Sequence, residues 1–297
     1  MSQTQALILS LLTLTTHDSW HVGFTFSSTA YEGLYTQAWG LWFFPLAVGA
    51  FSKCVFQQKM DPRWTSLIVA LTVMSHLFTG VLTAMACGCM LLAQPNYIRS
   101  SLRQLLSITL LSFAICAFWL VPLLLTREYL GGLPWMNANY DGWPLEQTLQ
   151  AFISGELLDA KRWPVLTVLT LGSLAFYLRR IRRSHAMQAC VLFGLITWFL
   201  IGGRETWGET YAALPLHKHV NPIRYITALQ TLALIASAKL CADLWKSISL
   251  SDGKRIVLAV ICLGIVGGFQ FSFLKRWMMS AAKLLFSHHQ RPFMLNK

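Results

Sequence analysis

Arg224 is the residue whose type and position point most directly to chemistry. Pro222 biases Asn221 toward extended backbone and itself suits a first helical turn, so the apolar segment that follows is expected to begin at about Pro222 or Ile223. A guanidinium in that turn would lie beside unpaired amide N–H groups at the positive end of the helix dipole, where phosphate is favoured, and could donate two parallel hydrogen bonds to it. The alternative is an interfacial arginine that anchors the helix to lipid headgroups. Three further candidate ligands for a phosphate or a headgroup lie on predicted outer loops: Lys218, His219 and Arg127.

Acidic residues on the predicted outer loops are the candidates for catalysis or cation binding. Asp18, which lies between two histidines, could take a proton from an acceptor hydroxyl; the alternative is a solvated loop acid. Glu205 and Glu209 are four residues apart, so in a helix they would share one face and could hold a divalent cation on a lipid-linked phosphate; the alternative is a polar rim. Asp141 is a further acid on an outer loop. We expect no resident metal and no cofactor.

His76 is the only residue that could carry an acid or base function, cysteines aside, in residues 64–93. As one helix, this stretch would carry the chain outward and would place Arg99 and Arg103 on the face where basic residues are rare. As two short helices broken near residues 75–79, it returns to the cytoplasmic side, so the sequence favours the broken pair. An ionisable residue at such a break is a functional hypothesis in a membrane protein. A neutral imidazole that caps the freed carbonyls is the structural alternative.

The composition decides which class of protein must position these residues. Hydrophobic residues make up 55% of the 297 residues, charged residues only 12%, and the mean hydropathy is +0.51, which excludes an ordinary soluble domain. The net charge of +12 does not indicate a nucleic-acid partner, because the basic residues cluster in short connectors between apolar stretches. All seven cysteines lie in apolar stretches and are interpreted as reduced core residues.

The apolar stretches predict an all-α, polytopic transmembrane helix bundle of about seven to nine membrane helices, with residues 1–297 forming a single integral membrane domain. Residues 105–126 contain no charge and would form about 33 Å of helix, enough to cross a bilayer. Four arginines within residues 179–183 mark a cytoplasmic connector. Polar loops are expected on the outer face at about residues 17–37, 127–162 and 202–222, the last two of them following the span at residues 105–126. A last crossing is expected at residues 256–274.

Three short motifs resemble parts of a known family. They are the Phe-Trp-Leu-Val-Pro sequence at residues 118–122, the Ser-His break at residues 75–76 and the Pro-Ile-Arg-Tyr sequence at residues 222–225. Over about residues 30–245, the chain is similar to the C-terminal portion of GT-C-type membrane glycosyltransferases. It is also similar to the bacterial GT-C-like membrane proteins described as 6-pyruvoyl-tetrahydropterin-synthase-related. The resemblance implies a helix bundle with large outer loops, a polyprenyl-phosphate sugar donor and a catalytic acid in the first outer loop, which here would be Asp18.

The resemblance implies a GT-C-like protein of cell-envelope glycan assembly in the bacterial inner membrane. Its partners would be membrane lipid and a polyprenyl-phosphate-linked sugar. Only sixteen residues precede the first predicted loop, so we expect a truncated first span, a chain inactive by itself as a transferase, and a separate N-terminal polypeptide as a further partner. The alternatives are a membrane transporter and a non-catalytic membrane assembly protein.

Overall fold

The computed structural model describes residues 3–15, 35–126, 129, 141–159, 163–214, 217 and 220–247, and every regular element among them is helical. The chain divides into two compact units, Met1–Ala242 and Asp243–Lys297, and the second is described only to residue 247. The helices in chain order are α1 (Gln3–Thr15), α3 (Tyr35–Val55), α4 (Pro62–Ser75), α5 (Leu77–Ala93), α6 (Asn96–Ser100), α7 (Leu102–Leu125), α8 (Leu145–Ile153), α9 (Glu156–Asp159), α10 (Val165–Leu178), η3 (Ile181–Arg183), α11 (His185–Ile201), α12 (Gly203–Trp207), η4 (Gly208–Ala213), η5 (Pro222–Tyr225) and α13 (Ile226–Ser247).

Three helical segments are long and apolar enough to cross a membrane: α3, α7 and Pro222–Ser247, which joins η5 to α13. A fourth is counted if α11 and the segment α12–η4, bent by 85°, form one broken span. The apolar helices α5 and α10 are shorter. Over the described residues the expected all-helical membrane architecture is confirmed, with three or four candidate spans. A total of seven to nine stays a prediction, and the crossing expected at residues 256–274 lies outside the described residues.

The break predicted within residues 64–93 is confirmed. Helix α4 ends at Ser75, His76 has extended backbone (φ −163°, ψ 122°), and α5 begins at Leu77. The Thr79 hydroxyl lies 2.7 Å from the carbonyl oxygen of His76 and 3.2 Å from that of Thr72, so it satisfies carbonyls freed by the break. Helix α3 packs closely here, because a Cβ at Gly40 would overlap the Thr79 hydroxyl. The imidazole therefore is not what caps the break.

Helix α7 meets the rest of the bundle along one narrow stripe, whose buried residues are Ile108, Ser112 and Cys116. The Ser112 hydroxyl donates to the Ser66 carbonyl of α4 at 3.1 Å, and the Cys116 thiol lies 3.8 Å from the carbonyl of Ala70. Small polar side chains that bond across closely packed helices are typical of membrane bundles. The other faces of α7 expose large apolar side chains, among them Phe118 (70% exposed) and Leu125 (75%). Such a surface suits contact with lipid.

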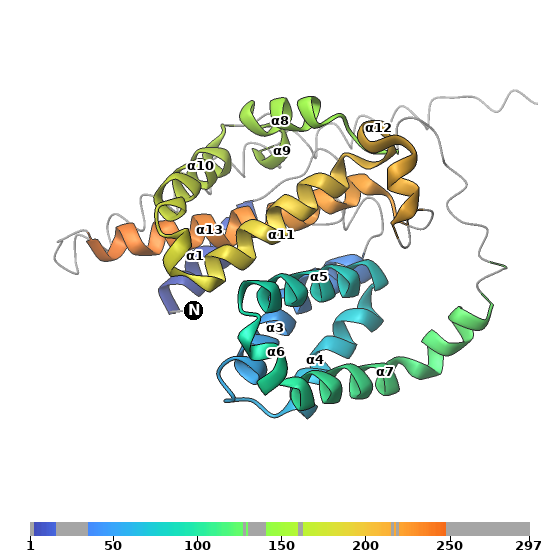
Figure 1. Ribbon diagram of the computed structural model, residues 1–297. Coiled ribbons are helices and arrows are strands. Elements are labelled where there is room, and N and C mark those ends of the chain that lie inside the picture. The colour runs from blue at the N-terminus through green and yellow to red at the C-terminus, as the bar shows by residue number, and fades with distance from the viewer. Residues whose placement is uncertain are drawn as a thin grey trace, which may run out of the picture. The chain divides into compact units, whose positions relative to one another are not determined.

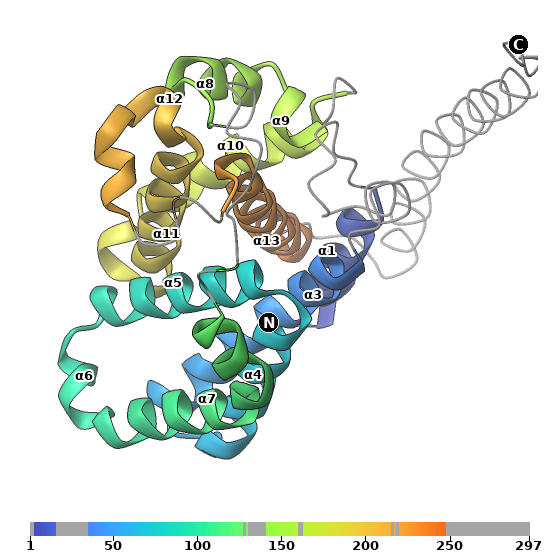
Figure 2. The same ribbon diagram turned by 90° about the vertical axis from the view of Figure 1, so that its right-hand side faces the viewer.

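Helix α5 contacts α3, α4 and α11, as Figures 1 and 2 show. One buried cluster joins α3, α5 and α11 to η5 and α13, and its aromatic members are Phe44, Phe78, Trp143, Phe193 and Tyr225. The core therefore packs the start of the last described span directly against the α4/α5 break.

Helix α10 begins beside a buried carboxylate. Asp159, only 6% exposed, accepts hydrogen bonds from the backbone N–H groups of Leu166 and Thr167, each at 2.9 Å, and from the Thr167 hydroxyl at 2.7 Å. A carboxylate at this end of a helix satisfies free amides and is favoured by the helix dipole. Further along, the Ser173 hydroxyl donates to the Ala236 carbonyl of α13 at 3.0 Å. The cap and this bond fix α10 to its neighbours.

Candidate anion-binding site

Two segments that are sixty residues apart in the chain are joined where α11 bends into α12. The bend leaves the last carbonyls of α11 and the first amides of α12 without helical partners. Residues 141–143 supply both kinds of group. The Trp143 amide donates to the Ile201 carbonyl at 3.0 Å, and the Asp141 carbonyl accepts from the amides of Arg204 (2.7 Å) and Glu205 (3.3 Å). Residues 141–143 therefore complete both broken helix ends.

Two glycines permit this close contact. Gly142 has φ +117°, and a Cβ there would lie 2.5 Å from the Gly202 carbonyl oxygen. Gly203 has φ +49°, and a Cβ there would overlap the Asp141 carbonyl oxygen and lie 2.8 Å from Cγ of Pro222. Positive φ and the lack of a side chain are thus both required at Gly203. The same glycine brings the start of η5 against the bend.

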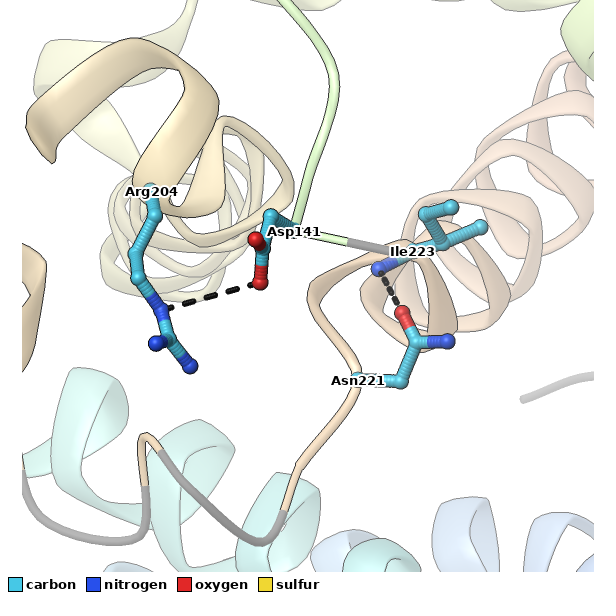
Figure 3. A network of polar contacts seen from close by, with 4 residues as sticks. All are labelled: Asp141, Arg204, Asn221 and Ile223. Atoms are coloured by element: carbon cyan, nitrogen blue, oxygen red, sulfur yellow. Dashed lines mark hydrogen bonds and ion pairs between the residues drawn. The ribbon is translucent and has the colours of Figure 1, made fainter. Parts of the chain in front are cut away.

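Asp141 and Arg204 also pair through their side chains. The Arg204 Nε lies 3.7 Å from Asp141 Oδ1, with 29% and 27% of the two side chains exposed. Figure 3 shows the arginine side chain reaching toward the carboxylate, with the start of η5 nearby. A half-exposed pair at this distance contributes little to stability, ~1 kcal/mol at most. The pair matters for the candidate site, because the carboxylate of Asp141 already has the charge of Arg204 beside it.

Arg224 lies in η5, which begins at Pro222 as the sequence predicts. The expectation of unpaired amides in this turn is wrong in part. The Asn221 side chain accepts from the Ile223 amide at 3.0 Å (Figure 3), and the Asn221 carbonyl accepts from the Arg224 amide at 3.1 Å. An anion near Arg224 would therefore depend on the guanidinium rather than on the first amides. The Arg224 side chain is half-buried, and no carboxylate of the described residues forms an ion pair with it.

His76 is an ionisable neighbour of Arg224 from another part of the chain. The charge of Arg224 acts directly on the imidazole. The ring of Phe78, two residues after the histidine, packs edge-on against the ring of Tyr225, one residue after the arginine, with centroids 5.2 Å apart. Both rings are buried. The structure thus places His76 near Arg224, two residues that the sequence had identified as unrelated candidates. The packing of Phe78 against Tyr225 was not predicted from the sequence.

Tyr211 is a second residue missed by the sequence argument. It is buried on η4, in the neighbourhood of Arg204 and Tyr225. A chain of neighbours therefore runs from the Asp141–Arg204 pair to Arg224 and His76. The sequence could have pointed to Tyr211, because it is one of two aromatic residues in the predicted outer loop at residues 202–222.

The carboxylates of Glu205 and Glu209 do not share a helix face. Helix α12 ends at Trp207, and Gly208 has φ +53°, which separates the two glutamates into different elements. Both side chains are exposed. In the part of the chain that the structure describes, no group of three or more His, Cys, Asp or Glu residues could hold a metal ion. Four predicted site residues lie outside the described residues: Asp18, Arg127, Lys218 and His219.

A family model described as "6-pyruvoyl-tetrahydropterin synthase related domain; membrane protein" matches residues 1–274 of the chain. No significant match is found among curated proteins or among solved structures.

Proposed function

We propose that this chain, which belongs to the 6-pyruvoyl-tetrahydropterin synthase related family of membrane proteins, binds the phosphate of a polyprenyl-phosphate-linked sugar. In this proposal it is a GT-C-like protein of seven to nine membrane helices that serves cell-envelope glycan assembly in a bacterial inner membrane. Family membership supports the membrane location alone. The ligand is proposed from the site and from the GT-C resemblance of the sequence.

One observation carries the proposal: Arg224 is a half-buried guanidinium without an acidic partner among the described residues. Removing a charge from water costs several kcal/mol unless an opposite charge or hydrogen bonds compensate. An anionic ligand would supply that compensation. A guanidinium is especially suited to phosphate, because its planar fork donates two parallel hydrogen bonds.

The position of Arg224 favours a lipid phosphate over a soluble anion. It lies at the start of Pro222–Ser247, a segment long and apolar enough to cross a bilayer. The end of such a segment lies at the depth of lipid headgroups, which is where the phosphate of a membrane-bound carrier also lies. A carrier lipid would therefore present its phosphate at the level of this guanidinium.

The test measures binding of a polyprenyl monophosphate to the full chain in nanodiscs, with the uncharged polyprenol as the control lipid. We expect binding that requires the phosphate, and a loss of roughly tenfold in Arg224→Lys, which keeps the charge but not the planar fork. The matched control is Arg103→Lys, because Arg103 is an exposed arginine at the start of another apolar helix, α7. Unchanged affinity in Arg224→Lys would reject bidentate binding and support the headgroup anchor.

The same preparation tests catalysis. We expect the chain by itself to bind a polyprenyl-phosphate sugar without transferring it. Sugar transfer that is lost in Asp18→Asn would overturn this expectation and would make Asp18 the catalytic base.

A transporter is the second candidate, and the bend of 85° between α11 and α12 favours it. Broken helices often form substrate sites in transporters, where both half-helix ends face the ligand. At this bend, however, residues 141–143 occupy both of those ends. Uptake of a polar solute into proteoliposomes, lost when Arg224 is replaced, would support transport over carrier-lipid binding.

A further inference from the structure

We infer that His76 is the second ligand of this phosphate, donating a hydrogen bond from Nε2 to the group that Arg224 binds. The headgroup would then be held between the α4/α5 break and η5. This inference rests on the proposed function of Arg224. It adds to the site a residue from the break between α4 and α5.

The geometry that carries the inference is the ring pair between the two elements. His76 is two residues before Phe78 and Arg224 is one residue before Tyr225, and the two rings pack edge-on with centroids 5.2 Å apart. Because both rings are buried, neither element can move away from the other without opening the core. The buried pair therefore fixes the imidazole and the guanidinium in each other's neighbourhood. The two side chains are also close enough to interact electrostatically.

The imidazole of His76 packs edge-on against the ring of Phe78, with centroids 6.3 Å apart, but it caps none of the backbone groups at the break. The Thr79 hydroxyl serves the carbonyls freed at the break, and the backbone amide of His76 donates to the Thr72 carbonyl at 3.2 Å. The Nδ1 atom of His76 is completely buried and has no hydrogen-bond partner among the described residues. A polar side chain at a helix break in a membrane protein that caps nothing is expected to have a functional role.

The buried Nδ1 atom also indicates which nitrogen faces the ligand. A proton on Nδ1 would be a buried donor without an acceptor, which costs about 1–3 kcal/mol. The tautomer with the proton on Nε2 leaves Nδ1 as a buried acceptor instead, and it places a neutral N–H donor on the nitrogen that can reach a ligand. Arg224 and His76 together thus offer a cation and a neutral N–H group, and neither has an acceptor in the described structure. Phosphate oxygens are the complementary partner, since they accept several hydrogen bonds and carry negative charge.

Substitutions of His76 that move the donor test this assignment in the full chain, with polyprenyl monophosphate in nanodiscs as the probe. His76→Gln places an amide N–H group near the position of Nε2, His76→Asn places one near Nδ1, and His76→Phe has none. We expect His76→Gln to bind within about threefold of the unsubstituted chain, and the other two variants to bind roughly tenfold more weakly.

Two results would overturn the inference. If His76→Asn and His76→Phe bind normally while Arg224→Met does not, His76 is not a ligand and the proposed function stands. If the unsubstituted chain does not bind polyprenyl monophosphate, both proposals fail.

A measurement without substitutions covers the case in which a variant does not fold. Diethyl pyrocarbonate acylates accessible imidazole nitrogens, and mass spectrometry gives the rate for each histidine. We expect polyprenyl monophosphate, but not polyprenol, to slow the modification of His76 at least several-fold. His185, exposed at the start of α11, serves as the internal control and should react at the same rate with either lipid. Equal rates at His76 with either lipid would overturn the inference.

Discussion

Replacing Gly203 by alanine should destabilise the protein strongly, because it adds a methyl group at the close contact where α12 begins. The Cβ would overlap the carbonyl oxygen of Asp141 and would lie 2.8 Å from Cγ of Pro222. Neither obstacle is the flexible end of a side chain, so the backbone on one side of the contact must move. The movement would separate residues 141–143 from the bend between α11 and α12.

The magnitude follows from the backbone conformation and from the bonds at risk. An alanine at φ +49° is in the left-handed region, which costs about 1–2 kcal/mol. Displacing the Asp141 carbonyl would also break its hydrogen bonds with the amides of Arg204 and Glu205, at roughly 0.5–1.5 kcal/mol each. We therefore expect the free energy of unfolding to fall by about 3 kcal/mol.

The assay is denaturant-induced unfolding of the purified full chain, followed by circular dichroism in mixed micelles. Gly88→Ala is the matched control, because a Cβ at Gly88 in α5 would meet no heavy atom within 4 Å. Alanine is the better helix former by up to ~1 kcal/mol, so the control should be neutral or slightly stabilised. If Gly203→Ala unfolds at the same denaturant concentration as Gly88→Ala, the close contact of residues 141–143 with the bend does not stabilise the protein.

Three further predictions concern other residues of the account. Asp141→Asn should lower the free energy of unfolding by less than ~1 kcal/mol in the same assay, since it removes a half-exposed ion pair but keeps the backbone carbonyl; a loss as large as that of Gly203→Ala would contradict this. Asp159→Ala should cost about 3 kcal/mol, because it leaves the buried amides of Leu166 and Thr167 without an acceptor, and a cost below ~1 kcal/mol would show that water replaces the carboxylate. In a background without other cysteines, single cysteines at positions 139 and 184 should be labelled from opposite sides of the membrane, and labelling from one side would reject the predicted topology.

Features set by local sequence could be predicted. The break at His76 follows from the length of residues 64–93 and from the charge on either side, and the structure has it within the predicted interval. The start of the last described span follows from Pro222, whose ring fixes the local backbone whatever surrounds it. These signals act over a few residues, so an isolated sequence contains them.

At two candidate sites a neighbouring residue decided the local structure. The first amides of η5 were expected to be free for phosphate, but Asn221 accepts from one of them through its side chain, a known capping role of this residue type. Glu205 and Glu209 would share a face only if one helix contained both of them. Gly208 takes a positive φ between them, and a glycine at that place was a warning in the sequence.

The site itself could not be predicted as a unit. The contact of Asp141 with Gly203, and that of Gly203 with Pro222, join segments separated by tens of residues, and no spacing rule relates them. The same holds for the pairing of Phe78 with Tyr225. The sequence identified His76 and Arg224 by their chemistry, whereas only the packing shows that they belong to one place.

The most direct test of lipid-phosphate binding uses a polyprenyl phosphate with a photoreactive diazirine beside the phosphate. After irradiation of the full chain in nanodiscs, peptide mapping locates the crosslinks. We predict that they fall on peptides covering residues 72–80 and 220–228 and that Arg224→Met removes them. Crosslinks spread instead along the lipid-exposed faces of α7, and unchanged in Arg224→Met, would contradict the account.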